Sequence, residues 1–267
     1  MAVRIALCLE YDGRPFCGWQ TQAGGCGIQD VLEAALGQVH GAPVQTVVAG
    51  RTDAGVHALA QVVHFDAIHP RPDSAWTRGV NALLPSGVAV LWARQVDAGF
   101  HARYAALERS YRYVLLNHPV RPALLAGRVG WMHAPLDVER MARAAASLVG
   151  EHDFSAFRAA ECQARSPVRQ LRRAEVTRHG DFILFEFSAN AFLHHQVRNM
   201  VGALVWVGLE RRPPEWVEAL LQSRDRTEGA ATFAADGLYL SRVRYDRRWG
   251  LPETAGRDLM PGLYARY

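Results

Sequence analysis

The sequence predicts an α+β fold built from two tandem split-βαβ halves of the ferredoxin or RRM type. In residues 1–105 the apolar pattern follows the order β-α-β-β-α-β, and the rest of the chain repeats this order with insertions. The two halves repeat the same topology but not the same amino-acid sequence. A length of 267 residues suits two modest domains. We place them at 1–105 and 106–249, followed by a tail at 250–267.

Each element of the first half has its own signal. Strands are predicted where β-favouring residues alternate, and helices where apolar side chains recur at helical spacing. Ser74 is the expected N-cap of the second helix, and Pro85 ends it. The predicted elements are, in order, a strand at Val3–Tyr11, a helix at Ile28–Val39, strands at Gln45–Ala49 and Ala58–Phe65, a helix at Ser74–Leu84 and a strand at Val88–Val96.

The second half extends the same order with longer elements. Asp137 is the expected N-cap of its first helix. The helix at Phe192–Leu209 is apolar nearly all round, so we expect it to be buried. The predicted elements are, in order, a strand at Glu108–Asn117, a helix at Asp137–Val149, hairpin strands at Gln170–Arg178 and Phe182–Ser188, helices at Phe192–Leu209 and Pro213–Leu221, and a closing strand at Gly237–Val243.

Composition favours a folded protein in a reducing compartment. Hydrophobic residues make up 49% of the chain and charged residues 21%, which excludes a mostly disordered chain. The four cysteines are too few and too scattered for a disulfide scaffold, and none forms the CxxC pair of a structural zinc site. No apolar run approaches the roughly 20 residues that span a bilayer, and no signal-peptide layout is present. We therefore expect a cytoplasmic protein without a membrane segment.

Arginine carries all the basic charge, since none of the 30 basic side chains is Lys. Codon bias in a GC-rich genome is one explanation, but guanidinium groups also bind phosphates and stack on bases. Residues 1–105 hold 7 Arg against 8 acidic residues, whereas residues 106–267 hold 23 against 18. We expect a polyanionic partner mostly on the second half, with Arg169, Arg172 and Arg173 among its contacts.

The segment Gly50–His57 (GRTDAGVH) is the most unusual in the chain. Loops between rigid strands often carry catalytic groups, so Asp53 is a candidate catalytic carboxylate. The alternative is a turn in which its side chain bonds nearby backbone N–H groups. The candidate cationic partner is Arg198, which would share a helix face with His194, although Arg198 also suits a structural ion pair. No metal-ligand spacing accompanies His194, so no metal is expected.

Arginine and tyrosine alternate in the predicted strand that contains Arg109-Ser110-Tyr111-Arg112-Tyr113. Alternating tyrosines in a strand most often pack in a core. Tyrosine framed by arginine also suits a flipped base, through stacking and phosphate contact. Tyr111 is therefore a candidate for contact with a substrate.

Seven sequence blocks together resemble the tRNA pseudouridine synthase A family. They occur in the family's order from about Ile5 to Arg244, nearly the whole chain, and the GRTDAGVH string is the most specific. The blocks are Tyr11–Gln20, Gly50–His57, Asn81–Pro85, Phe100–Arg103, Arg109–Tyr113, Gly150–Phe157 and Phe192–Gly202. The chain departs from the family at Ala60, where Gly is usual, and in the tail after Trp249.

The resemblance implies that the sheets of the two halves join into one extended, mostly antiparallel sheet with helices on one side, and that a cleft lies between the halves. It also implies an enzyme that isomerises uridine to pseudouridine in the anticodon stem-loop of tRNA, without a cofactor. The base must leave its stack, which costs a few kcal/mol. A homodimer in which one tRNA contacts both subunits is implied as well.

The same resemblance assigns roles by position. Asp53 matches the catalytic aspartate, and Arg198 matches the basic residue that pairs with it. Tyr111 matches the tyrosine that packs against the target base, and Arg51 matches a residue that holds the tRNA or the space left by the flipped base. An ionised Asp53 would attack the base or the sugar carbon, or stabilise positive charge as the bond breaks. The Tyr111 hydroxyl is a candidate for proton transfer.

Two other functions use some of these features. A tandem RRM-like RNA-binding module without catalysis would carry an RNP1-type strand, and neither Arg112–Asn117 nor Phe182–Ser188 supplies one. A carboxylate-based nucleosidase acting on small molecules would not need arginine concentrated in the second half. The sequence therefore favours an enzyme that acts on tRNA.

Overall fold

The computed structural model describes residues 2–252, and the predicted tail lies outside them from residue 253 onwards. Within residues 2–252 the chain has an α+β fold, as predicted, with ten strands and four α-helices. Contacts divide it into two units. Unit 1 comprises residues 2–108 and 239–252, and unit 2 comprises residues 109–238. No helix in this described part of the chain is long and apolar enough to cross a membrane.

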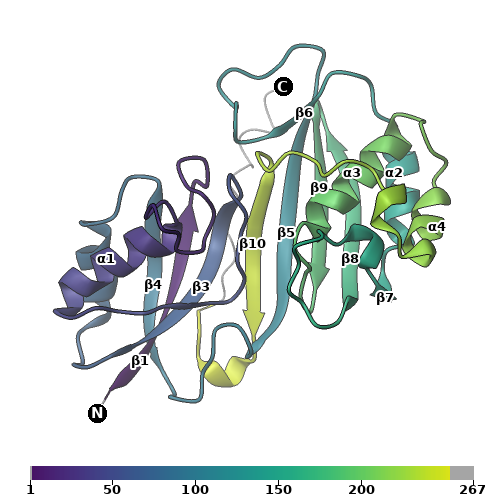
Figure 1. Ribbon diagram of the computed structural model, residues 1–267. Coiled ribbons are helices and arrows are strands. Elements are labelled where there is room, and N and C mark those ends of the chain that lie inside the picture. The colour runs from purple at the N-terminus through teal and green to yellow at the C-terminus, as the bar shows by residue number, and fades with distance from the viewer. Residues whose placement is uncertain (1, 253–267) are drawn as a thin grey trace. The chain divides into compact units, whose positions relative to one another are not determined.

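Unit 1 is a mixed sheet with helix α1 on one of its faces (Figure 1). The strand order is β4-β1-β3-β10, with β2 also paired to β3. Strand β1 is antiparallel to both β3 and β4, whereas β10 runs parallel to β3. The elements are β1 (Val3–Tyr11), α1 (Ile28–His40), β2 (Val47–Val48), β3 (His57–Ala67), η1 (Ala75–Gly79), β4 (Val88–Val96), β10 (Leu238–Tyr245) and η4 (Arg247–Trp249).

The last strand packs with unit 1, although the sequence order placed it in the second half. Tyr239 of β10 lies opposite His57 of β3 in a parallel pair. Parallel neighbours are not joined by a tight hairpin, so the local pattern contained no sign of this partner. Within residues 2–252, unit 1 then holds 11 Arg against 10 acidic residues, and unit 2 holds 17 against 14. The charge difference between the units is therefore smaller than the sequence halves suggested.

Most elements of unit 1 agree with the sequence. The bounds of β1 and β4 are those predicted, and α1 extends the predicted helix by one residue. Ser74 has a helical backbone and makes no capping hydrogen bond through its side chain, so its predicted role as N-cap is wrong. A π-helical turn, η1, follows it. Helical periodicity does not reveal such a turn, because π-turns arise from local insertions in the hydrogen-bond pattern.

Unit 2 is also mostly antiparallel, in the strand order β5-β9-β8-β7, with β6 parallel to β5. Strands β8 and β9 form the predicted hairpin, whose turn includes Gly180 at a φ of 59°. The elements are β5 (Ala106–Asn117), β6 (Gly130–Met132), α2 (Val138–Ala146), β7 (Gly150–Asp153), η2 (Ser155–Phe157), β8 (Val168–His179), β9 (Phe182–Ala189), α3 (Gln196–Gly208), α4 (Trp216–Ser223) and η3 (Arg226–Glu228). Strands β6 and β7 were not predicted.

Two helices of unit 2 test the predictions most directly. Asp137 caps α2 as predicted, since its carboxylate accepts a hydrogen bond from the Arg140 N–H at 3.0 Å. Helix α3 is buried at every position except Arg198 and Trp206, as its apolar sequence predicts. It begins at Gln196 rather than Phe192, because His195 has a left-handed backbone (φ 61°) that a right-handed helix cannot include.

Candidate active site

The loop that carries Asp53 lies in unit 1 between β2 and β3, as the sequence predicts. Thr52 is buried, Asp53 is half-buried and Arg51 is exposed. A backbone hydrogen bond from the Val56 N–H to the Asp53 carbonyl oxygen (3.1 Å) closes the turn. Gly55 adopts a φ of 78°, which residues with a side chain rarely adopt. The Asp53 loop, residues 50–57, is therefore a tight turn with its carboxylate near the surface.

A buried network of three polar side chains lies beneath the Asp53 loop. The hydroxyl groups of Tyr11 and Thr52 are 2.8 Å apart. The Gln61 amide donates to the Tyr11 hydroxyl at 3.2 Å and to the Gly50 carbonyl oxygen at 2.7 Å. Burial raises the pKa of Tyr11 to about 12, so this hydroxyl stays neutral. The network thus fixes both residues that flank Arg51 onto the strands of the sheet.

The segment after β1 packs directly against the same loop. A side chain at Gly13 would collide with the Val56 carbonyl oxygen, and one at Gly18 would come within 2.8 Å of the Thr52 carbonyl oxygen. The Trp19 N–H donates to that same Thr52 oxygen at 2.9 Å. Both glycines are therefore required for close approach. Two of the sequence blocks, Tyr11–Gln20 and the Asp53 loop, form one structural feature.

His57 ends the Asp53 loop and joins it to the C-terminal strand of unit 1. Its buried ring stacks on Tyr239 of β10, with centroids 4.6 Å apart and an interplanar angle of 19°. Its Nδ1 accepts a hydrogen bond from the Gly13 N–H at 3.1 Å and lies 3.4 Å from an Asp12 oxygen. Hydrogen bonds from Arg14 lower the pKa of the Asp12 carboxyl below its usual range. The loop is thus held at its last residue as well as at Thr52.

Tyr111 lies on β5, where it and Tyr113 are both buried as the alternation predicts. The Tyr111 ring meets Phe192 edge to face, with centroids 5.1 Å apart. The Tyr113 hydroxyl donates to the Ala234 carbonyl oxygen at 3.0 Å. Core packing therefore accounts for Tyr113. Tyr111 has an aromatic ring whose orientation is fixed by Phe192, which suits contact with a base.

Arg198 lies in the first turn of α3 and is half-buried. Its Nε donates to the Phe233 carbonyl oxygen at 2.8 Å, and the Phe233 N–H donates back to the Arg198 carbonyl oxygen at 3.3 Å. The first bond fixes the direction of the guanidinium. The predicted helical pairing of His194 with Arg198 is wrong, because His194 precedes the helix and the left-handed His195 separates the two.

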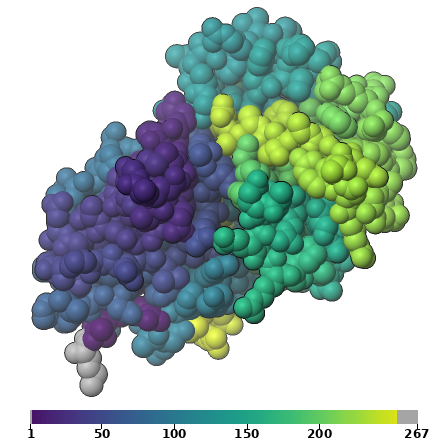
Figure 2. All heavy atoms as spheres, in the orientation of Figure 1, coloured from purple at the N-terminus to yellow at the C-terminus, as the bar shows by residue number. Residues whose placement is uncertain are grey.

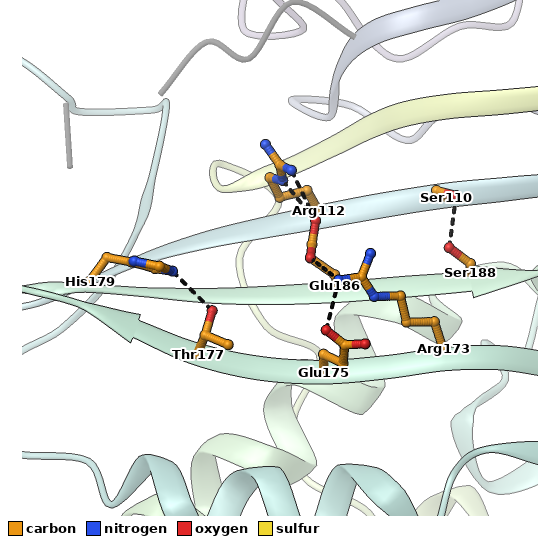
Figure 3. Close-up of polar contacts among 8 residues, drawn as sticks. All are labelled: Ser110, Arg112, Arg173, Glu175, Thr177, His179, Glu186 and Ser188. Atoms are coloured by element: carbon orange, nitrogen blue, oxygen red, sulfur yellow. Dashed lines mark hydrogen bonds and ion pairs between the residues drawn. The ribbon is translucent and has the colours of Figure 1, made fainter. Parts of the chain in front are cut away.

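The three predicted phosphate-binding arginines lie on β8, but their side chains differ in environment. Arg173 contacts the carboxylates of Glu175 and Glu186, each at 2.7 Å (Figure 3). Arg169 donates to the carbonyl oxygens of Ser166 and Val168, and Arg172 is exposed. Their contact with RNA stays a prediction, and for Arg173 it would compete with two acidic neighbours.

The sequence did not predict that Tyr11, Thr52 and Gln61 position the Asp53 loop. A weak signal was present, since Gln61 is a polar residue in the predicted apolar strand Ala58–Phe65. Gln61 is fully buried, and a buried amide is nearly always hydrogen-bonded. Its partners could not be read from the sequence, because Tyr11 is 50 residues away along the chain.

Comparison with known proteins identifies the family. A sequence model of the family described as tRNA pseudouridine synthase matches residues 7–105 and 144–246, most of the chain. The chain belongs to the tRNA pseudouridine synthase family. Asp53 and Arg198 fall inside the two segments matched by this synthase family, whereas Tyr111 falls between them.

Relatives within the family match nearly full length. The chain is 61% identical over 255 residues to tRNA pseudouridine synthase A of Thiobacillus denitrificans, which covers 96% of this chain and 98% of the relative. It is 58% identical over 261 residues to the protein of that name from Dechloromonas aromatica, covering 98% and 99%. Among solved structures, an archaeal box H/ACA sRNP Nop10-Cbf5 complex matches with a TM-score of 0.39 and 14% identity, over 88% of this chain and 47% of that one.

Proposed function

We propose that Asp53 is the catalytic carboxylate of this tRNA pseudouridine synthase. As a member of the family, the chain is an isomerase that converts uridine in tRNA to pseudouridine. The observation that supports Asp53 is its place on a loop fixed on both sides, by the Tyr11–Thr52–Gln61 network before it and by Gly13 and Tyr239 after it. A reacting group held in this way needs little reorganisation when substrate binds.

The reaction gives the carboxylate a clear task. The C1′–N1 bond of uridine breaks, the uracil turns, and C5 joins C1′, so that no atom is gained or lost. An ionised carboxylate can attack the base or the sugar carbon, or stabilise the positive charge that develops on the sugar. Each of these routes requires an oxygen of Asp53 at a defined distance from the reacting atoms, which a fixed loop provides.

Three further residues have supporting roles in this proposal. Tyr111 offers its ring to the flipped uracil, in the orientation set by Phe192. Arg198 is the basic partner of Asp53 that the family resemblance implies, and its guanidinium is oriented by the Phe233 carbonyl oxygen. Arg51, exposed beside Asp53, contacts the tRNA or fills the space left by the flipped base. The family resemblance and these local contacts support the assignment.

The same proposal places the target uridines on the 3′ side of the anticodon arm. It also makes the enzyme a cytoplasmic homodimer in which one tRNA contacts both subunits. The resemblance supports these details. Because arginine and tyrosine bind phosphates and stack on bases without reading base edges, we expect several neighbouring uridines to be accepted.

The Asp53→Asn variant tests the proposal most directly. We expect loss of pseudouridine formation on tRNA transcripts, with unchanged tRNA affinity and unchanged thermal unfolding, since only a carboxylate oxygen is replaced. Asp73→Asn is the matched control, because it removes the same charge from unit 1 at a half-exposed side chain paired with Arg94. Mapping the position of each pseudouridine in the same transcripts tests whether the modified uridines lie in the anticodon arm. Turnover by Asp53→Asn at the wild-type rate would remove Asp53 from the mechanism.

The arginines of β8 are tested by their effect on salt dependence. Replacing Arg169, Arg172 and Arg173 together with Gln should weaken tRNA binding and lower the slope of log affinity against log salt by about 0.7–0.9 for each phosphate that the variant no longer neutralises. The control is the triple replacement of Arg71, Arg78 and Arg94, which removes the same charge from unit 1. Equal slopes for the wild type and the β8 variant would show that these arginines are only a solvent-exposed face of the sheet and do not contact phosphates.

A further inference from the structure

Two of the four cysteines are joined in unit 1, on either side of Gly18 and Trp19, which contact the Asp53 loop. A disulfide links Cys17 to Cys26, whose Cα atoms are 5.4 Å apart. The Cys17 N–H also donates to the Cys26 carbonyl oxygen at 2.9 Å. Cys17 is exposed and Cys26 is half-exposed. The pair could not be predicted from the sequence, because a separation of nine residues matches no common motif.

The ring that this bond closes is connected to the Asp53 loop by main-chain contacts. Within it, the Trp19 N–H donates to the Thr52 carbonyl oxygen at 2.9 Å, and Gly18 lies against the Thr52 and Asp53 backbone. The intervening residues 20–25 are exposed, and in Figure 2 the purple segment before α1 lies at the surface of unit 1. Beyond the ring, the Ile28 N–H donates to the Gly18 carbonyl oxygen at 3.1 Å. A restraint on Cys17 is therefore a restraint on the chain that contacts Thr52.

We propose that Cys17 and Cys26 form a reversible thiol–disulfide site, and that its oxidation state controls how firmly residues 17–27 hold the Asp53 loop. The proposal rests on the proposed function of Asp53 for its effect on turnover. The oxidant is a low-molecular-weight disulfide of the glutathione type. One cysteine thiolate attacks it, forming a mixed disulfide and releasing one small thiol. The second cysteine thiolate then displaces the other small thiol.

The exchange is balanced in atoms and electrons. Two protein thiols lose two electrons and two protons and form one S–S bond, while the small disulfide gains them and becomes two thiols. Both protein sulfurs belong to residues that solvent reaches, as the exchange requires. Gly24 and Gly25, next to Cys26, are exposed and have no atoms packed against them.

The remaining cysteines differ from this pair. Cys8 is fully buried, and burial raises the pKa of its thiol to about 12, so it is inert. For Cys162 in unit 2, burial alone would raise the thiol pKa, but hydrogen bonds from the Ala164 and His194 N–H groups and the charge of Arg158 lower it below its usual value. Cys162 is thus a competing thiol that the experiment must remove.

The test uses the full chain with Cys162→Ser, equilibrated in reduced and in oxidised glutathione buffers. Alkylation followed by intact mass counts the free thiols, and hydrogen exchange reads the protection of residues 17–29 and 50–57. In the oxidised buffer we expect two fewer alkylated thiols, stronger protection of the Trp19 amide, and a kcat/KM on tRNA transcripts at least about 5-fold higher, near the lower end of usual coupling between two sites.

Cys17→Ser and Cys26→Ser in the same background should each lose the response to the buffer. Disulfide formation and protection of the Asp53 loop are measured without turnover, so their results do not depend on whether Asp53 is catalytic. If Cys17 and Cys26 both remain free in the oxidised buffer, the site does not exist. If the disulfide forms while exchange and turnover stay the same in both buffers, the bond does not restrain the Asp53 loop.

Discussion

Each unit contains one cluster of polar side chains, and the two clusters differ in charge and burial. In unit 1 the three side chains beneath the Asp53 loop are neutral and buried: Tyr11 bonds both Thr52 and Gln61 out of contact with water. In unit 2 the face of the sheet drawn in Figure 3 carries an ionic network, in which Glu186 contacts both Arg112 and Arg173 at partly exposed positions. The buried network fixes the positions of its side chains, whereas the ionic network contains charged groups that can change partners.

The energetic consequences differ accordingly. A buried hydrogen bond contributes about 1 kcal/mol, and leaving a buried partner unsatisfied costs about 1–3 kcal/mol. A solvent-exposed ion pair is worth about 0–1 kcal/mol, because water and salt compete with it. The buried hydrogen bonds of unit 1 therefore keep the Asp53 loop in place. In unit 2, Arg173 can exchange a carboxylate for an RNA phosphate at little cost.

The largest expected effect is the loss of folding stability in acid, which we attribute to a buried histidine of unit 1. His64 on β3 is buried and its Nδ1 accepts a hydrogen bond from the Ala102 N–H at 3.1 Å. Burial, assisted by the charge of Arg4, lowers the pKa of His64 from 6.5 to about 4. Between these values the unfolded chain binds more protons, so stability is full above pH 6.5 and falls as the pH drops towards 4. The loss amounts to at most about 3 kcal/mol.

Denaturant unfolding at several pH values, followed by hydrogen exchange in β1 and β3, measures this loss. His64→Gln keeps an acceptor for the Ala102 N–H but does not titrate, so its stability should fall less over the same pH range. His179→Gln, at an exposed position on the hairpin of unit 2, is the control. If the His64→Gln variant lost as much stability in acid as the wild type does, groups other than His64 would be responsible for that loss.

The second test breaks the buried network beneath the Asp53 loop. Thr52→Val keeps the shape of the side chain but removes the oxygen 2.8 Å from the Tyr11 hydroxyl. We expect a loss of about 1–2 kcal/mol in unfolding free energy. Because Thr52 adjoins Asp53, kcat should fall more than KM rises. Thr52→Ser retains the hydroxyl and should restore both. A variant that loses stability but keeps its kcat would show that the network supports the fold alone.

The same contrast explains how far the sequence could be interpreted. Alternation predicted β1, β4 and the β8–β9 hairpin, and an unusual loop between strands pointed to Asp53, because these signals are local. The partner of β10 and the Tyr11–Thr52–Gln61 network could not be predicted, since each joins segments distant in sequence. The π-turn at Ala75–Gly79 and the left-handed His195 depend on packing that periodicity does not encode.

The smallest expected effect concerns the ionic network of unit 2. Arg173 donates to Glu175 and contacts Glu186, and these acidic neighbours raise the pKa of its guanidinium. Arg173 is half-exposed, so Arg173→Gln should lower the unfolding free energy by less than about 1 kcal/mol. Arg112 remains on Glu186 in this variant, which keeps that carboxylate paired. Raising the salt to about 0.5 M should shrink the difference further.

Arg109→Gln is the matched comparison within the same unit. Arg109 is buried on β5, and it donates to the Asn190 carbonyl oxygen at 2.8 Å. Its loss should cost more than the loss of Arg173, by about 1–3 kcal/mol, and salt should change the result little, because the Arg109 side chain is buried. Denaturant unfolding of both variants at low and high salt measures the difference. If Arg173→Gln proved the more damaging of the two, the exposed face of unit 2 would be structural, and its arginines could not readily exchange carboxylates for phosphates.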